Sequence, residues 1–109
     1  IYVSGHGSRQ FDSSPIPIHQ ISKIRKSINK NTVLIYDTGI RNGEDILKVL
    51  CLGADFVMIG KHALFSIAAE GFDGLVQMTN NLKKEIEIAM AQMGNFDINK
   101  LNSKYLNDF

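Results

Sequence analysis

The sequence predicts an α/β fold in which short apolar strands alternate with amphipathic helices and pair in parallel. Three observations carry this prediction. Predicted strands begin at residues 1, 33 and 55, each strand leads into a loop rich in Gly and polar residues, and stretches of helical periodicity separate the strands. These connections are long enough for crossovers between parallel strands.

The first unit combines the end of a strand, a long loop and a helix. Residues 1–4 form the end of a buried strand, and residues 5–17 form a loop rich in Gly, Ser and Pro. Four isoleucines then recur at spacings of three and four, with basic residues between them: Ile18, Ile21, Ile24 and Ile28. Residues 18–29 are therefore expected to form an amphipathic helix.

The second unit begins with the wholly apolar run VLIY at residues 33–36. Such a run is typical of a parallel strand that is covered on both faces. A helix is expected from Gly43 to Leu52, because Glu44 and Asp45 lie in its first turn, where the helix dipole favours acidic groups.

The third unit begins with the strand DFVMIG at residues 55–60. A short helix over 61–71, a long helix over 74–93 and a polar helical segment over 97–106 are expected to follow it. A (β/α)₈ barrel takes about 250 residues, and this chain has three βα units in 109 residues. We therefore expect residues 1–109 to be the C-terminal part of a single TIM (β/α)₈ barrel domain, its last three βα units, with the upstream part missing.

Composition excludes several classes of partner and site. The chain has 12 basic and 11 acidic residues, so its net charge of +1 creates no field that would attract nucleic acid. The single cysteine, Cys51, can form no disulfide framework or zinc site alone, and its apolar neighbours predict a buried structural thiol. No metal site is predicted, and no apolar run approaches the roughly 20 residues that span a bilayer.

Unusual residue types gather in three loops, each of which follows a predicted strand. In parallel α/β folds, such loops at the carboxyl ends of strands form the active face. The three loops are SGHGSRQFD at 4–12, DTGIRNG at 37–43 and GKHAL at 60–64. The chemistry of the protein is therefore expected on this face.

The second and third loops have the composition of a phosphate site. A phosphate is held by backbone N–H groups at a helix N-terminus, with Gly allowing close approach and a cation nearby. Gly39 with Arg41, and Gly60 with Lys61, supply this combination twice. Alternatively, these glycines serve only tight turns and the cations are solvated. Asp37 can accept hydrogen bonds from sugar-like hydroxyls or can cap the turn that follows it.

The first loop pairs a proton acceptor with a carboxylate anchor. His6 can exchange a proton near neutral pH, and the planar guanidinium of Arg9 suits a carboxylate. Such a pair fits chemistry at the carbon next to a carboxylate, although a structural role for His6 is the alternative. His19 is expected on a helix surface and His62 in a loop, with no role in a site for either.

Three ordered motifs resemble a known family. SGHGSRQFD, DTGIRNGEDILKVLCLGAD and VMIGKHAL resemble the carboxyl-terminal part of the FMN-dependent α-hydroxy-acid dehydrogenases and oxidases, most of all the bacterial quinone-linked L-lactate dehydrogenases. The resemblance implies that His6 is the catalytic base, that Arg9 holds the substrate carboxylate and that Ser4 lies near the flavin. It further implies that the remaining site residues hold the FMN ribityl chain and phosphate: Asp37, Thr38, Gly39, Ile40, Arg41, Gly60 and Lys61.

The reaction implied by the resemblance is the oxidation of an L-2-hydroxy acid such as L-lactate to the 2-oxo acid, with reduction of FMN. His6 would take either the hydroxyl proton or the α-proton, and the sequence does not choose between them. A quinone, oxygen or another acceptor would take the electrons. The family further implies a homo-oligomeric cytoplasmic enzyme, either free or peripheral at the inner face of the cell membrane.

Some positions depart from the family pattern. Lys61 stands where Arg is usual, Gly5 replaces Asn, Thr38 replaces Gly or Ser, and His62 replaces Pro. The family's flavin lysine, substrate tyrosines, second arginine and histidine-orienting carboxylate all fall upstream of Ile1, so we expect this chain alone to be inactive. Two rival readings stay open: a non-catalytic phosphate-binding or assembly fragment, and another FMN or sugar-phosphate barrel enzyme.

Overall fold

A three-stranded parallel sheet lies at the centre of the computed structural model, which describes residues 1–107. Its strands are β1 (Tyr2–Val3), β2 (Ile35–Tyr36) and β3 (Phe56–Val57), and they lie side by side in chain order. Ile35 pairs with Tyr2 on one side and with Phe56 on the other. Three parallel strands in sequential order are the arrangement that the sequence predicts.

The predicted helix over 18–29 is divided in two. A 3₁₀ helix, η2 (Pro17–Gln20), leads into α1 (Ile21–Ser27). Proline at the first position presets the helical φ and needs no N–H partner, which explains the earlier start. The helix ends before position 29 because Ile28 is extended, with φ −113° and ψ 162°.

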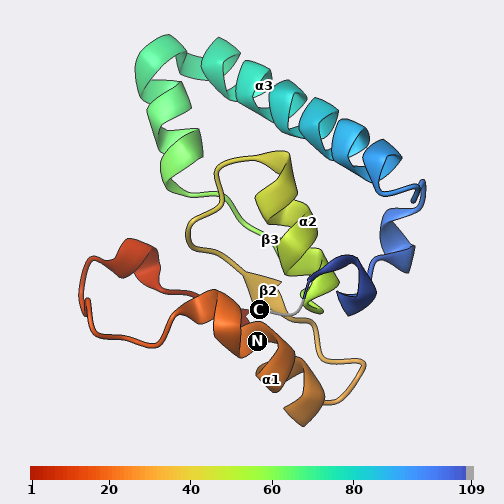
Figure 1. Cartoon of the computed structure of the whole chain (residues 1–109). Coiled ribbons are helices and arrows are strands. Elements are labelled where there is room, and N and C mark those ends of the chain that lie inside the picture. The colour runs from red at the N-terminus through yellow and green to blue at the C-terminus, as the bar shows by residue number, and fades with distance from the viewer. Residues whose placement is uncertain (108–109) are drawn as a thin grey trace.

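The other two predicted helical regions agree more closely with the structure. Helix α2 (Gly43–Cys51) ends one residue before the predicted Leu52. Helix α3 (Lys61–Gln92) is broken at Gly71, where φ is 60° and ψ −138°, so it has two arms. The two helices predicted over 61–71 and 74–93 correspond to these arms, which meet at the bend visible in Figure 1.

The prediction of one helical segment over 97–106 is wrong. The chain forms two short 3₁₀ helices there, η3 (Ile98–Lys100) and η4 (Ser103–Tyr105). The side chain of Asp97 accepts a hydrogen bond from the backbone N–H of Asn99, and that of Asn102 accepts one from the N–H of Lys104. Such local bonds from Asp and Asn favour turns over a continuous helix.

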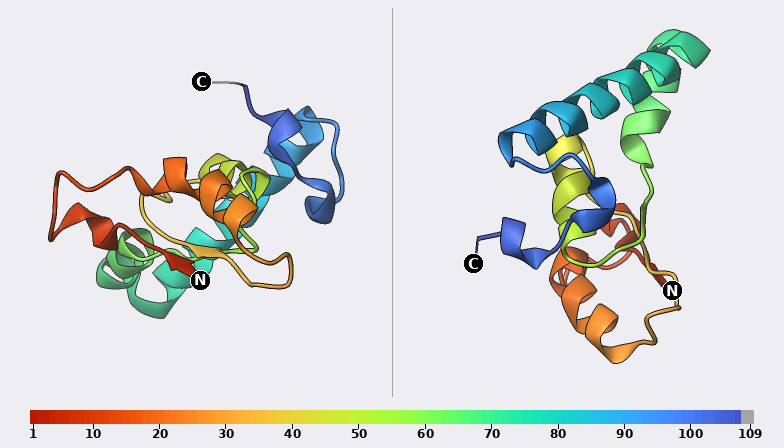
Figure 2. Two further views of the ribbon diagram at one scale, coloured as in Figure 1. Left: turned by 90° about the horizontal axis from the view of Figure 1, so that it is seen from below. Right: turned by 90° about the vertical axis from the view of Figure 1, so that its right-hand side faces the viewer.

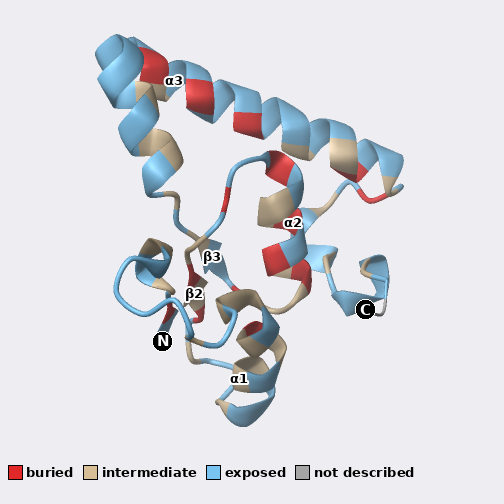
Figure 3. Ribbon diagram, turned by 60° about the vertical axis from the view of Figure 1, so that its left-hand side comes forward, coloured by how far each residue is buried: buried red, intermediate tan, exposed pale blue. Residues whose placement is uncertain are grey.

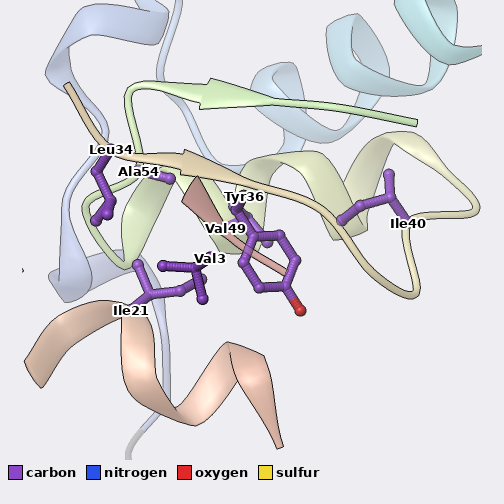
Figure 4. Close-up of a cluster of buried hydrophobic side chains, with 7 residues drawn as sticks. All are labelled: Val3, Ile21, Leu34, Tyr36, Ile40, Val49 and Ala54. Carbon is purple, nitrogen blue, oxygen red and sulfur yellow. The ribbon is translucent and has the colours of Figure 1, made fainter. Parts of the chain in front are cut away.

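One face of the sheet is covered and carries the core (Figure 4). Ile21 of α1 and Val49 of α2 are fully buried against the sheet. Seven side chains form this cluster: Val3, Ile21, Leu34, Tyr36, Ile40, Val49 and Ala54. Helix α2 lies between α1 and the second arm of α3 (Figures 1 and 2). The predicted burial of Cys51 is confirmed.

The opposite face of the sheet is open. Tyr2, Phe56 and Met58 remain 47%, 60% and 50% exposed, and much of α3 is exposed as well (Figure 3). The expectation of strands covered on both faces therefore fails for this chain. In a closed barrel this face would point into the interior, which is filled by side chains from all eight strands. Within residues 1–107, no helix combines the length and apolarity needed to cross a bilayer.

Arg25 ties α1 to the amino-terminal edge of the sheet. Its Nη1 contacts Asp55 Oδ2 at 3.1 Å, and its Nη2 donates to the carbonyl oxygens of Asn29 at 3.0 Å and Thr32 at 2.8 Å. The same Asp55 oxygen accepts the backbone N–H of Leu34 at 2.8 Å. The guanidinium thus connects the end of α1 and the turn that follows it with the N-terminal ends of β2 and β3.

Candidate functional site

The three loops at the carboxyl ends of the strands surround one cavity of about 850 Å³. This volume lies within the range of about 300–1,000 Å³ that is typical of small-molecule sites. Nine of the ten predicted site residues line it: His6, Arg9, Asp37, Thr38, Gly39, Ile40, Arg41, Gly60 and Lys61. Three fixed cations and one carboxylate are among them, so the cavity favours an anionic ligand.

Ser4 is the predicted site residue that does not line the cavity. Its hydroxyl oxygen accepts a hydrogen bond from the backbone N–H of His6 at 3.0 Å. Ile40 does line the cavity, but its side chain is buried in the core (Figure 4), so its backbone is the part that can face a ligand. These two residues therefore shape the loops that carry the other groups.

The first loop places His6 in a left-handed turn. His6, Gly7 and Ser8 have φ values of 48°, 65° and 58°, and the backbone N–H of Ser8 closes the turn on the carbonyl oxygen of Gly5 at 2.7 Å. For residues other than Gly this conformation costs about 1–2 kcal/mol each. Strain of this kind persists where surrounding contacts fix it, and it gathers at ligand sites.

His6 and Arg9 are in direct contact. Arg9 Nη2 lies 3.2 Å from His6 Nε2, and Arg9 Nε is 3.4 Å from the carbonyl oxygen of His6. A guanidinium has only donors, so the Nε2 atom presents its lone pair in this contact. An anion that drew Arg9 away would free this lone pair to accept a proton. The predicted base and the predicted carboxylate anchor are thus brought together in one place.

The second and third loops leave room for a phosphate. A Cβ atom built at Gly39, where φ is 76°, or at Gly60 would meet no atom within 4 Å, so the space in front of both backbones is open. Lys61 Nζ donates to the carbonyl oxygen of Gly7 at 3.2 Å, and Arg41 lines the same cavity. Open glycines, two cations and the start of α3 match the needs of a phosphate. The residues present therefore fit the phosphate end of a nucleotide cofactor.

Asp37 holds the loops together by accepting hydroxyl hydrogen bonds. Tyr2 donates to Oδ2 at 2.8 Å and Thr38 donates to Oδ1 at 2.9 Å. Burial raises the pKa of Asp37, but hydrogen bonds from Ser4, Tyr2 and Thr38, together with the charge of His6 when its ring is protonated, outweigh burial, so the pKa lies below its ordinary value. The bond to Asp37 in turn raises the pKa of Tyr2. A carboxylate kept ionised in this way suits a ligand with hydroxyl groups.

Several lining residues were not found from the sequence: Gly7, Ser8, Met58, His62, Leu64 and Phe65. The placement of His62 in a loop is wrong, because it lies in the first turn of α3. Its Nδ1 is buried and has no hydrogen-bond partner within the described residues. The signal for its position was available, since the helix begins immediately after Gly60. His19 was expected on a helix surface, and it lies exposed in η2, outside the cavity.

Comparisons with known proteins agree with this geometry. A family model described as FMN-dependent dehydrogenase matches residues 1–108. The 2-hydroxyacid oxidase of Dictyostelium discoideum is 38% identical over 108 residues, which are 99% of this chain and 28% of the oxidase. The L-lactate oxidase of Lacticaseibacillus rhamnosus is 40% identical over 94 residues, covering 86% of this chain and 26% of that protein.

A solved structure gives the same result for the fold. The crystal structure of the monotopic membrane protein (S)-mandelate dehydrogenase matches 99% of this chain with a TM-score of 0.94 at 33% identity, and the match spans 28% of that chain. The predicted architecture, the C-terminal part of a (β/α)₈ barrel, is thereby confirmed. The chain spans less than a third of the length of these relatives. On the match to residues 1–108 and on this shared fold, the chain belongs to the family of FMN-dependent dehydrogenases.

Proposed function

We propose that the complete barrel containing this chain oxidises an L-2-hydroxy acid, L-lactate above all, to the 2-oxo acid. The observation that carries the proposal is the contact of His6 with Arg9 at 3.2 Å, on the same cavity as two open glycine loops. A base beside a carboxylate anchor, next to a phosphate-sized opening, matches a substrate that carries its hydroxyl one carbon from its carboxylate. The names of the oxidases that resemble this chain support the same substrate class.

Arg9 and His6 divide the work on the substrate. The guanidinium of Arg9 binds the substrate carboxylate through paired N–H donors and leaves the contact with His6. The freed Nε2 of His6 accepts either the hydroxyl proton or the α-proton as the substrate loses two electrons. Both routes use the same atom of His6.

The cofactor is held by the other two loops. Asp37, held by Thr38, would accept hydroxyls of the ribityl chain, while Gly39, Gly60, Arg41 and Lys61 would hold the phosphate. FMN, when bound, supplies the two-electron redox chemistry of the reaction. A quinone, oxygen or another acceptor would take these electrons. The complete enzyme would be a cytoplasmic homo-oligomer, either free or peripheral at the membrane.

The test uses the full-length protein. We expect it to contain FMN and to lose its flavin absorbance when L-lactate is added without oxygen. His6→Gln should abolish this bleaching and keep the flavin, because the amide cannot accept the proton. His19→Gln is the matched control, since His19 is exposed and lies outside the cavity, and both properties should be unchanged. Loss of flavin in His6→Gln would instead indicate a structural role.

The isolated chain of 109 residues should not turn over. Its sheet is open on one face, and the missing strands of the barrel would have to close it. FMN titrated into the isolated chain should therefore bind weakly and should not be bleached by lactate. Micromolar binding together with lactate-dependent bleaching would contradict this expectation, and binding without bleaching would favour a phosphate-binding fragment.

A further inference from the structure

Two hydroxyl groups hold the two oxygens of Asp37 separately. The phenol of Tyr2, on β1, donates to Oδ2 at 2.8 Å, and the hydroxyl of Thr38, in the loop after β2, donates to Oδ1 at 2.9 Å. Carboxylate oxygens together offer about four acceptor positions. Since Asp37 also lines the cavity, positions remain for a hydroxyl group of a ligand, and the carboxylate cannot rotate without breaking a bond.

The Thr38 hydroxyl has a second bond, which reaches the first loop. Its oxygen accepts the backbone N–H of Gly5 at 2.8 Å while its proton goes to Asp37. Gly5 opens the turn that carries His6, because its carbonyl oxygen accepts the N–H of Ser8 at 2.7 Å. One side chain therefore connects the carboxylate in the second loop with the backbone of the loop that holds the base.

Thr38 makes these bonds from a strained backbone. Its φ is 103°, in the region that favours glycine, although threonine is branched at Cβ. Glycine would take this conformation without strain, but it has no hydroxyl. The strain at Thr38 thus accompanies a hydroxyl that bridges two loops, which is the pattern expected where a site requires a particular group.

We propose that Tyr2 and Thr38 are positioning residues of the flavin site: together they fix the Asp37 carboxylate for the hydroxyls of the FMN polyol chain, and Thr38 also fixes the loop that carries His6. The proposal rests on the proposed function. The proposal assigns different effects to the two residues, because Tyr2 bonds only to the Asp37 carboxylate, whereas Thr38 bonds to the carboxylate and to the backbone of the first loop.

The expected results follow from this division. In the full-length protein, Tyr2→Phe should weaken FMN binding about tenfold, which corresponds to about 1.4 kcal/mol, and should lower kcat of the FMN-saturated enzyme less than Thr38→Val does. Thr38→Val, which keeps the shape and loses the hydroxyl, should weaken FMN binding to a similar extent and also lower kcat severalfold. Thr38→Ser, which keeps the hydroxyl, should keep both the FMN affinity and the kcat of the unmodified protein. Tyr105→Phe, on the exposed η4, is the control for loss of a phenol and should change neither property.

A purely structural role is separated by Thr38→Gly. This change relieves the strained φ and removes the hydroxyl, so the melting temperature of the apo protein should be kept or raised while FMN binding, measured by quenching of flavin fluorescence, still weakens about tenfold. A fall of melting temperature and affinity together would overturn the proposal. So would FMN affinity within twofold of the unmodified protein in both Tyr2→Phe and Thr38→Val, or equal losses in Thr38→Ser and Thr38→Val.

Failure of the proposed reaction can be told apart from failure of the positioning role. If the full-length protein binds FMN but L-lactate and other 2-hydroxy acids do not bleach it, the proposed reaction is refuted, and so is the proposed effect of Thr38 on kcat. The FMN affinities of the variants still decide whether Tyr2 and Thr38 position Asp37. If the full-length protein binds no FMN, both proposals are overturned.

Discussion

Gly43, the first residue of α2, is expected to be intolerant of any side chain. A Cβ at this position would lie 2.6 Å from Ile86 N, 2.7 Å from Glu85 Cβ and 2.9 Å from Glu85 C, all in α3. Ordinary contacts are about 3.5–4.0 Å, so α3 would have to move by about 1 Å. The N–H of Gly43 also donates to Glu85 Oε2 at 2.7 Å, and this bond would lengthen with the same movement.

The cost of Gly43→Ala follows from three contributions. Overpacking costs about 1–3 kcal/mol, and weakening a hydrogen bond to a carboxylate costs up to about 1.5–3 kcal/mol. The preference of a helix for Ala over Gly returns at most about 1 kcal/mol. We expect the free energy of unfolding to fall by about 2–4 kcal/mol, against a total of about 5–15 kcal/mol for a typical protein.

Urea unfolding of the full-length apo protein, followed by far-ultraviolet circular dichroism, measures this loss. With a slope of about 3 kcal/mol per M, a loss of 3 kcal/mol lowers the midpoint by about 1 M. Glu85→Gln is the control that keeps the space and weakens the bond, and it should lose less than half as much. A Gly43→Ala midpoint equal to that of the unmodified protein, or to that of Glu85→Gln, would refute the argument from close contact.

Three further outcomes are expected. Arg25→Met should lower the free energy of unfolding by about 1–2 kcal/mol in the same urea assay, since it removes three bonds at the end of α1, and an unchanged midpoint would contradict this. The stability that Asp37 gains by being ionised should be complete above pH 3.8 and lost as pH falls through its lower folded pKa, so urea midpoints of the unmodified protein and Asp37→Asn should converge in acid and not near pH 7. Lys61→Met should weaken FMN binding about ten- to a hundredfold in fluorescence titrations, while Lys104→Met, outside the cavity, should leave the affinity unchanged.

Most of the fold could be predicted because the hydrophobic periodicity of each segment agrees with the residues that begin and end it. The apolar run at 33–36 and the acidic first turn after Gly43 each predict one element without knowledge of the rest. Two of the predictions that failed have clear physical causes. Asp97 and Asn102 cap short turns where a helix was expected, and the open sheet face reflects contacts that this chain does not contain.

The candidate site was predictable where its chemistry is local in sequence. His6 and Arg9 are three residues apart, so their contact follows from one turn. Tyr2 was missed because it reaches Asp37 across 35 positions from a strand with no special pattern. The strained φ of Thr38 was missed for a similar reason, since only the bond from Gly5, in a distant loop, explains it.

The placement of the core within the chain has a consequence for the order of folding. The seven residues of this cluster lie between Val3 and Ala54, so the cluster can assemble before α3 packs. The parallel pairing of β1 with β2 closes a loop of about 30 residues, which is slow, and we expect the assembled segment to wait for the strands that complete its sheet. During that interval its bare apolar face and two unpaired edges are exposed to other chains, so the lifetime of this state should limit the yield of correctly folded protein.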